Sequence, residues 1–215
     1  MEEYHKIQTI FKRNPETKFK TLLMNEYSLP EFEYLKNNEW VFTEKVDGTN
    51  IRIMYENKEI RFGGKTNNAQ IPILLLDGLN KIFNSKRIDK LINIFGDTSV
   101  CLYGEGYGAK IQKGGGNYRH DNSFVLFDIK IGDYWLQRKD VDDIAVELDI
   151  DTVPVIGSGS LDDLILLVQS GFKSTWGDFI AEGVVARPST ELKTRSGHRI
   201  ITKLKYRDFQ GGGLI

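Results

Sequence analysis

The spacing of hydrophobic residues predicts a chain in which strands and helices follow one another without a regular alternation. An apolar run favours a strand over residues 40–44, and alternating positions favour a partner strand over residues 51–55, with a turn at residues 47–48 between them. A hairpin is expected to continue through residues 59–62. Apolar residues at helical spacing within residues 73–95 indicate one or two helices.

The second half of the chain is expected to return to strands and then to combine them with helices. The predicted strands cover residues 99–104, 124–131, 134–136, 182–186 and 199–205, and the predicted helices cover residues 141–148 and 161–169. Ser160, followed by Asp162 and Asp163, is typical of a helix N-terminus. Because no βαβ rhythm emerges, we expect an α+β fold built on antiparallel sheets.

Residues 1–38 contain no long periodic segment, and Pro15 and Pro30 interrupt them. The full length of 215 residues is enough to bury a core of its own. We therefore expect a single domain over residues 1–215, with residues 1–38 as an N-terminal extension that packs on it.

Composition narrows the class of protein. Hydrophobic residues make up 40% and charged residues 27%, which is typical of soluble globular proteins. No apolar run approaches the ~20 residues that span a bilayer, and the acidic N-terminus lacks the apolar segment of a secretory signal. A single cysteine, Cys101, excludes an intramolecular disulfide and a cysteine-rich zinc site. These features predict a cytoplasmic protein without a membrane partner.

The overall charge is not that of a strongly basic nucleic-acid binder. The net charge is −1 and the sequence pI is about 6.3. Any contact with nucleic acid must therefore use local groups of basic residues. Such groups occur in residues 12–20, 81–90 and 193–207, and each has the alternative of being a solvated face.

The segment Lys45-Val46-Asp47-Gly48 places a lysine after an apolar strand and before a glycine turn. Lysine becomes a nucleophile when its amine loses a proton near neutral pH, which burial or a neighbouring positive charge promotes. The four-residue pattern is weak by itself, because a lysine at the end of a strand is usually solvated.

Lys203 and Lys205 alternate on one predicted strand, so both ammonium groups project from the same face. Like charges side by side are unfavourable unless an anion joins them, and a polyphosphate would do so. The alternative is an exposed basic edge strand that discourages aggregation.

Two glutamates and one phenylalanine complete the set of candidates. Glu105 ends a predicted apolar strand and Glu182 begins one, each beside a glycine that lets a ligand approach. A carboxylate at such a place can bind a ribose hydroxyl or metal-bound water, and the alternative is a surface charge. Phe127 offers an aromatic face for a base, and the alternative is a place in the core.

Taken in order, these groups resemble the motifs of the covalent nucleotidyltransferase superfamily, which contains polynucleotide ligases and mRNA capping enzymes. The matching segments are Lys45-x-Asp-Gly, Glu105, residues 124–129, residues 182–185 and Lys203-x-Lys205. DNA ligases and capping enzymes usually carry arginine five positions after the lysine, where this chain has Asn50. This residue is similar to that of ATP-dependent RNA ligases, in particular the branch of the phage double-strand-directed and trypanosome editing ligases.

The resemblance implies a ligase adenylation fold, with antiparallel β-sheets flanked by helices and an ATP cleft between them. It implies that Lys45 attacks the α-phosphate of ATP, which Lys203 and Lys205 contact. Glu105 would bind the ribose, and Phe127 would stack on adenine.

The same resemblance assigns the remaining residues. Glu182, together with Asp47, would hold waters of a Mg²⁺ or Mn²⁺ ion. Lys65 would contact the ribose or a 5′-phosphate, and Gln112 would assist the RNA step after adenylylation. The nucleotide pocket would also be lined by Glu44, Gly48 and Asn50.

The implied function is that of an ATP-dependent RNA ligase that joins 5′-phosphate and 3′-hydroxyl ends through lysyl-AMP and an adenylylated 5′ end. The expected partners are RNA ends, in nicked duplexes or bridged strands. Because the chain ends ten residues after Lys205, no C-terminal accessory domain is expected, and a partner protein would be one source of further RNA-binding surface. The alternatives are a minimal DNA ligase, a capping-type guanylyltransferase, and a non-catalytic nucleotide- or RNA-binding module.

Overall fold

The computed structural model describes residues 2–210, so Met1 and residues 211–215 of the predicted domain lie outside the described part. Contacts divide the chain into two compact units. Unit 1 is made of Met1–His5 and Asp47–Val153, and unit 2 is made of Lys6–Val46 and Pro154–Ile215. The chain thus passes from unit 2 to unit 1 within the segment that contains Lys45.

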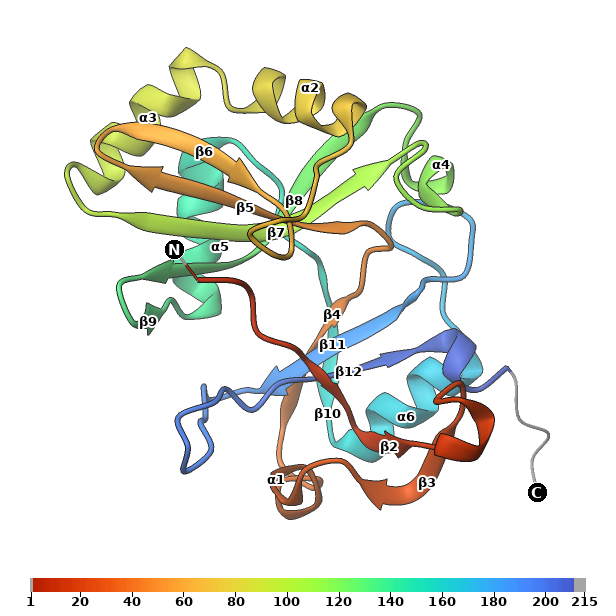
Figure 1. Cartoon of the computed structure of the whole chain (residues 1–215). Helices are drawn as coiled ribbons and strands as arrows, with labels where there is room; N and C mark the ends of the chain where they lie inside the picture. The colour runs from red at the N-terminus through yellow and green to blue at the C-terminus, as the bar shows by residue number, and fades with distance from the viewer. Residues whose placement is uncertain (1, 211–215) are drawn as a thin grey trace. The chain divides into compact units, whose positions relative to one another are not determined.

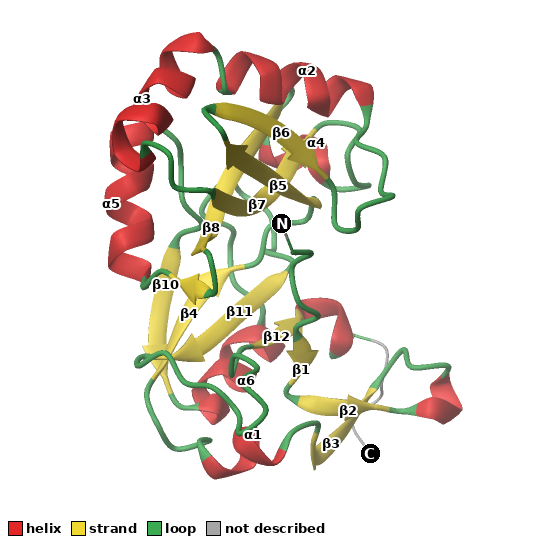
Figure 2. Cartoon of the chain, turned by 60° about the vertical axis from the view of Figure 1, so that its left-hand side comes forward, coloured by secondary structure: helices red, strands yellow, loops and turns green. Residues whose placement is uncertain are grey.

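Unit 1 is built on a five-stranded antiparallel sheet of order β6-β5-β7-β8-β9 (Figure 1). Its strands are β5 (Thr49–Glu56), β6 (Glu59–Gly63), β7 (Val100–Gly108), β8 (Asn122–Ile131) and β9 (Tyr134–Trp135). Its helices are α2 (Ile73–Ile82), α3 (Ser85–Phe95), α4 (Gly115–Tyr118) and α5 (Arg138–Leu148). Figures 1 and 2 show α2, α3 and α5 on one side of this sheet.

The alternation of side chains along β5 explains how unit 1 separates its core from its polar face. Ile51, Ile53 and Tyr55 are fully buried in one cluster with residues of α2, α3 and α5. Since neighbouring side chains of a strand point to opposite faces, Asn50 and Arg52 project from the other face. This core cluster therefore occupies one side of the sheet, and Asn50 and Arg52 lie on the other side.

Unit 2 contains a second five-stranded sheet, of order β1-β12-β11-β4-β10. Its strands are β1 (Gln8–Thr9), β4 (Trp40–Glu44), β10 (Val155–Gly159), β11 (Gly183–Pro188) and β12 (Thr202–Lys205). β1 pairs with β12 in parallel, and the other pairs are antiparallel. A separate hairpin is formed by β2 (Phe11–Arg13) and β3 (Leu22–Tyr27).

The helices of unit 2 close its own core. They are α1 (Pro30–Tyr34) and α6 (Leu161–Ser170), with short 3₁₀ turns at Pro15–Thr17 and Tyr206–Asp208. Trp40 and Phe42 of β4 are buried together with Leu164 and Val168 of α6. The Ser160 side chain and the Asp163 carboxylate cap the start of α6 reciprocally, which confirms the helix start expected from this segment.

Comparison with the expected elements confirms the predicted α+β class and most of the predicted segments. The differences concern short elements: β1, β2, β3, β10, α1 and α4 were not individually predicted. Residues 199–201 precede β12 rather than forming part of it. These segments have two to six residues, too few to show a period, and long-range partners stabilise them.

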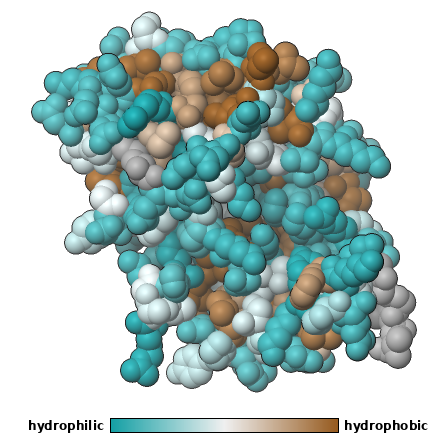
Figure 3. All heavy atoms as spheres, in the orientation of Figure 1, coloured by the Kyte–Doolittle hydropathy of each residue, from teal (hydrophilic) through white to brown (hydrophobic). Residues whose placement is uncertain are grey.

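Most side chains on the face shown in Figure 3 are hydrophilic, and apolar atoms gather over α2 and α3. Ile73 and Leu74 at the start of α2 are 76% and 52% exposed. Across the described part of the chain, no helix combines the length and apolar character needed to cross a membrane.

Candidate active site

Three charged side chains meet where adjacent strands of unit 2 begin or end. Lys45 follows β4, Glu182 precedes β11, and Lys205 ends β12. The Nζ atom of Lys45 lies 2.6 Å from Oε2 of Glu182, and the Nζ atom of Lys205 lies 2.6 Å from Oε1 of the same carboxylate. Only 12–19% of each of these side chains is exposed. We call Lys45, Glu182 and Lys205 the lysine–glutamate cluster.

The backbone around Gly183 fixes this cluster. The Lys45 N–H donates to the Gly183 carbonyl at 2.9 Å, and Gly183 stands opposite Lys205 in the β11–β12 register. Gly183 has a φ of +156°, and a Cβ atom there would lie 2.0 Å from the Leu204 carbonyl oxygen. Only glycine allows this close approach, so the glycine next to Glu182 sets the spacing of its two lysine partners.

The electrostatics of the cluster keep Glu182 ionised. Burial raises the pKa of a carboxyl group, but the charges and hydrogen bonds of Lys45 and Lys205 outweigh burial, and the pKa of Glu182 lies below its ordinary value. Lys203 lies two residues before Lys205 and shares its face of β12, as predicted from the alternation, and both are half-buried. Unit 2 therefore gathers cationic groups in a partly desolvated place that suits an anionic ligand.

Glu44 has its own set of partners in unit 2. Its carboxylate is 1% exposed and accepts hydrogen bonds from Ser174 Oγ at 2.6 Å, Thr175 N at 2.8 Å and Thr175 Oγ1 at 2.9 Å. The residue predicted to line a nucleotide pocket thus anchors a segment 130 residues away. Sequence reasoning missed Ser174 and Thr175, because nothing in their spacing marks them.

In unit 1, Gly48, Asn50 and Glu105 form a second group. Asn50 and Glu105 stand opposite each other on β5 and β7, so their side chains share the face of the sheet that lies opposite the core cluster. A Cβ atom on Gly48 would lie 2.3 Å from the Gly106 carbonyl oxygen and 2.7 Å from Cγ of Glu105. The glycine after Asp47 is therefore required for this contact.

The Oδ1 atom of Asn50 is buried and has no hydrogen-bond partner among residues 2–210. An unpaired buried acceptor costs about 1–3 kcal/mol, and such atoms are rare in folded proteins. A ligand hydroxyl or amino group that donates to this oxygen would remove the penalty. This atom, opposite Glu105 on the neighbouring strand, consequently indicates a place prepared for a ligand in unit 1.

The loop between β7 and β8 contacts the turn after Lys45. The Nε2 atom of Gln112 donates to the Gly48 carbonyl at 3.1 Å, and the Asp47 N–H donates to the Tyr118 hydroxyl at 3.2 Å. Gln112, predicted to assist an RNA step, thus contacts the Lys45-x-Asp-Gly segment. The contact between Tyr118 and Asp47 was not predicted from the sequence.

Lys65 is exposed in the loop after β6. This loop is held by Arg52, which donates from Nε to the Gly64 carbonyl at 2.9 Å and from Nη2 to Oδ1 of Asn67 at 3.0 Å. Arg52 is only 1% exposed. It was not a predicted site residue, although an arginine between two isoleucines on an alternating strand was a usable signal.

Phe127 occupies a bulge in β8, where the register with β7 shifts. Its ring is half-buried and packs edge-on against Tyr4, with the ring centroids 5.0 Å apart. The Tyr4 hydroxyl donates to the fully buried Asp128 at 2.5 Å. Stacking of Phe127 on adenine stays a prediction, and neither Tyr4 nor Asp128 was found from the sequence.

The predicted site residues thus fall into two groups, each described within its own unit. Unit 2 brings Lys45, Glu182 and Lys205 into contact and places Lys203 on the same strand face, whereas Glu44 is engaged elsewhere. Unit 1 brings Gly48 into contact with Gln112 and sets Asn50 opposite Glu105. Within residues 2–210, no three His, Cys, Asp or Glu side chains gather as a metal-binding cluster.

Comparisons with known proteins give a family and a similar fold. A family model described as RNA ligase matches residues 38–205. A comparison with curated proteins gave no match.

Solved structures of an RNA ligase from Naegleria gruberi are similar in fold. A ligand-free variant has a TM-score of 0.66 at 15% identity, with 96% of this chain and 58% of that chain covered. A variant with ATP and Mn has a TM-score of 0.68 at 15% identity, with coverage of 95% and 56%. A variant with AMP and Mn gives 0.61 at 16% identity, with coverage of 93% and 57%. This chain therefore spans less than 60% of the length of these ligases, and its architecture matches the predicted ligase adenylation fold.

Proposed function

Because this chain belongs to the RNA ligase family, we propose that it is an ATP-dependent RNA ligase that joins 5′-phosphate and 3′-hydroxyl ends through AMP bound covalently to Lys45. The observation that carries this proposal is the lysine–glutamate cluster, in which two ammonium groups flank one carboxylate at 2.6 Å. Such a cluster has a net positive charge, which attracts phosphates, and contains a primary amine that can act as a nucleophile.

In the proposed first step, the amine of Lys45 loses a proton to solvent and attacks the α-phosphorus of ATP. A nitrogen–phosphorus bond forms, and the bond to pyrophosphate breaks. Lys203 and Lys205 would stabilise the negative charge that grows on the α-phosphate oxygens in the transition state. The lowered pKa of Glu182 makes it a weak base, so its role at this stage would be to orient Lys45 and Lys205.

The nucleoside of ATP would be recognised by unit 1. Glu105 would accept a hydrogen bond from a ribose hydroxyl, and the unpaired Oδ1 of Asn50 would accept another from the ligand. Phe127 and Lys65 keep the roles expected from the sequence, stacking on adenine and contacting the ribose or a 5′-phosphate. Asn50 also supports the RNA-ligase branch over DNA ligases and capping enzymes.

The carboxylates present fit a divalent cation that keeps much of its water. Mg²⁺ is usually held by one or two carboxylates together with substrate phosphates rather than by a closed protein cage. Glu182, joined by Asp47, would supply such contacts through water, and the bound cation would neutralise phosphate charge. The similar Naegleria gruberi structures contain ATP and Mn or AMP and Mn, which supports these ligands for the present chain.

Two further steps complete the proposed reaction. AMP passes from Lys45 to the 5′-phosphate of one RNA end, and the 3′-hydroxyl of the other end then attacks that phosphate and releases AMP. The contact of Gln112 with the Gly48 carbonyl supports a role for this side chain near the nucleotide during the RNA steps.

Incubation with labelled ATP and Mg²⁺ tests the proposal. The wild-type protein is expected to acquire covalent AMP, and Lys45→Ala is expected to lose the adduct completely. Lys12→Ala, which removes an exposed lysine of unit 2 outside the cluster, serves as the matched control and is expected to label normally. A Lys45→Ala protein that still acquires AMP would refute the assignment.

A sealing assay then separates the related activities. Nicked duplexes and single strands of RNA and DNA with matched sequences are expected to show preference for RNA at the 3′-hydroxyl side. Faster sealing of an all-DNA nick would identify a DNA ligase. Labelling by GTP but not by ATP would identify a capping-type enzyme, and ATP binding without any adduct would identify a non-catalytic module.

A further inference from the structure

A groove with basic walls lies on unit 1, beside the loop that joins β7 to β8. Its volume is about 640 Å³, and it is bounded by α2, by the start of α3 and by the loop. Four cationic and two carboxylate side chains line it, in addition to His120. The cationic residues are Lys81, Arg87, Lys110 and Arg119, and the carboxylate residues are Asp77 and Asp121.

The walls of this groove are held together by short contacts. Gly78 of α2 packs so close to Asn122 that an added Cβ atom would lie 3.0 Å from the Asn122 carbonyl oxygen. The Nδ2 atom of Asn122 donates to the Ala109 carbonyl at 2.8 Å, and the Ala109 N–H donates to the Arg119 carbonyl at 3.1 Å. The groove is therefore formed before a ligand binds, which reduces the entropy lost on binding.

Two lysines in the groove are available to an anion. Lys81 and Lys110 are both exposed, and within residues 2–210 neither takes part in an ion pair. Arg119 donates to the Asp121 carboxylate at 3.0 Å, which neutralises one of the two acidic groups. Net positive charge therefore remains at the mouth of the groove.

The backbone at Lys110 adopts a conformation that glycine favours over a residue with a side chain. Lys110 has a φ of +66°, in the left-handed region where a non-glycine residue costs roughly 1 kcal/mol. Glycine would adopt this conformation without strain. A lysine at this position therefore places a charge at the groove at some expense of stability.

The groove is linked to the turn that follows Lys45. The loop that carries Lys110 and Arg119 also carries Gln112, which donates to the Gly48 carbonyl, and Tyr118, which accepts from the Asp47 N–H. Lys110 and Arg119 thus flank the part of the loop that contacts this turn. A polymer lying in the groove would have its end guided towards residues 47–48.

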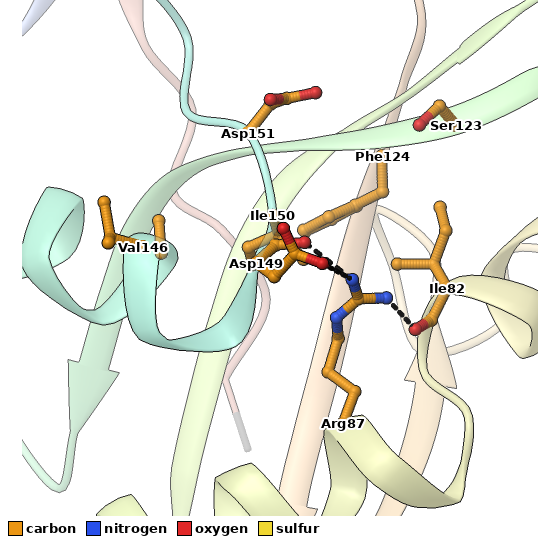
Figure 4. Close-up of a pocket in the computed structure, with 9 residues that line it drawn as sticks. Ile82, Arg87, Ser123, Phe124, Val146, Asp149, Ile150 and Asp151 are labelled. Atoms are coloured by element: carbon orange, nitrogen blue, oxygen red, sulfur yellow. Dashed lines mark hydrogen bonds and ion pairs between the residues drawn. The ribbon is translucent and has the colours of Figure 1, made fainter.

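A neighbouring cavity of about 470 Å³ has a different character (Figure 4). There the Arg87 guanidinium donates to the backbone carbonyls of Ile82 and Asp149 and to the Asp149 carboxylate. Asp151 adds a second carboxylate to the lining. Its lining holds one cationic side chain, Arg87, against two carboxylates, whereas the groove holds four cationic side chains against two carboxylates. This cavity therefore does not suit a phosphate.

We infer that the groove lined by Lys81, Lys110 and Arg119 binds the phosphodiester backbone of the RNA strand whose end is joined. This inference rests on the proposed function for the identity of the polymer. Apart from His120, the described lining contains no aromatic ring on which a base could stack. Recognition therefore acts on phosphates, is independent of sequence and weakens with salt.

The test uses single-stranded, 5′-phosphorylated RNA of mixed sequence, with binding followed by fluorescence anisotropy at several salt concentrations. The variants are Lys81→Ala, Lys110→Gly and the double variant. Lys58→Gly is the matched control, because Lys58 is also exposed and has a φ of +64°, but lies in the β5–β6 turn, away from the groove.

Each groove variant is expected to bind RNA about fivefold more weakly near 0.1 M salt and to reduce the salt slope by about 0.7, the value for one single-strand phosphate contact. The double variant is expected to lose about 25-fold on the same basis. Lys110→Gly is expected to keep or slightly raise the thermal stability of the wild type, because glycine relieves the left-handed strain, which separates binding from folding. Lys58→Gly is expected to bind RNA like the wild type.

Labelling with ATP in the absence of RNA distinguishes this inference from the proposed function. Groove variants that form the AMP adduct normally but bind and seal RNA poorly would support the groove. Normal RNA affinity of the double variant would overturn it, and so would an equal loss in Lys58→Gly. A wild-type protein that binds RNA through the groove but never acquires AMP would refute the proposed function alone.

Discussion

Replacing Glu182 with glutamine removes one negative charge from between two ammonium groups while keeping the size of the side chain. Each lysine nitrogen lies 2.6 Å from a carboxylate oxygen, and 12–19% of each side chain is exposed. Removing one partner of a buried ion pair destabilises a protein by about 3–5 kcal/mol. Because some water reaches this cluster, we expect the lower end, about 3 kcal/mol, which corresponds to a fall in Tm of roughly 6–12 °C.

The effect of Glu182→Gln should depend on pH in a defined direction. In the folded protein the pKa of Glu182 is lowered from its ordinary value of 4.5. The unfolded chain therefore binds the proton at a higher pH than the folded protein does. The stabilisation that ionised Glu182 gives the folded protein is complete above the pKa of this group in the unfolded chain. It is lost as the pH falls through the pKa of Glu182 in the folded protein.

Thermal unfolding of the wild type and Glu182→Gln from about pH 7 down to pH 3 measures this dependence. The difference in Tm should be constant at neutral pH and should shrink in acid, because the wild type then carries a protonated Glu182. Glu33→Gln, an exposed position on α1, is the control and should leave Tm nearly unchanged. A difference that is absent at neutral pH, or that grows in acid, would refute the reasoning about the cluster.

Two further substitutions separate ligand binding from folding in unit 1. Asn50→Ala removes the unpaired buried oxygen, so Tm should fall by little or rise. The KM for ATP in the labelling reaction should increase about 10-fold or more, as expected for a lost hydrogen bond of about 1.5 kcal/mol. An unchanged KM would argue against a ligand contact. Gly48→Ala places a Cβ atom 2.3 Å from the Gly106 carbonyl oxygen, so both the yield of the AMP adduct and Tm should fall. For a clash that costs about 1–3 kcal/mol, Tm should fall by several degrees. An unaltered Tm in calorimetry would contradict the close approach.

Secondary structure was predictable where the chain had long periodic segments. The strand at Trp40–Glu44 and the helices in residues 73–95 follow from local patterns of apolar residues, and the structure contains them. The two-residue strand β1 has no such pattern and exists because it pairs with β12, almost 200 residues away. Strand β10 contains two glycines, which weaken any strand signal, and forms at the edge of the sheet through its pairing with β4.

Among the site residues, local rules placed Lys203 and Lys205 correctly on one face of a strand. The same rules did not find Arg52, whose guanidinium is buried against the loop of Lys65. They also did not find Ser174 and Thr175, which bind the Glu44 carboxylate. The contacts of Glu44 leave no period in the sequence, because its partners Ser174 and Thr175 lie 130 residues or more away.

The sequence by itself determined the class of fold, the position of Lys45 at the end of a strand and the order of the charged motifs, because these depend on alternation within short segments and on residue type. Only the tertiary structure decided which charges meet. Lys45 and Glu182 are 137 residues apart in the chain, and their contact depends on β4 and β11 lying side by side with Gly183 against Leu204. The same is true of the basic groove, since Lys81 and Lys110 come together only because α2 packs through Gly78 against the start of β8.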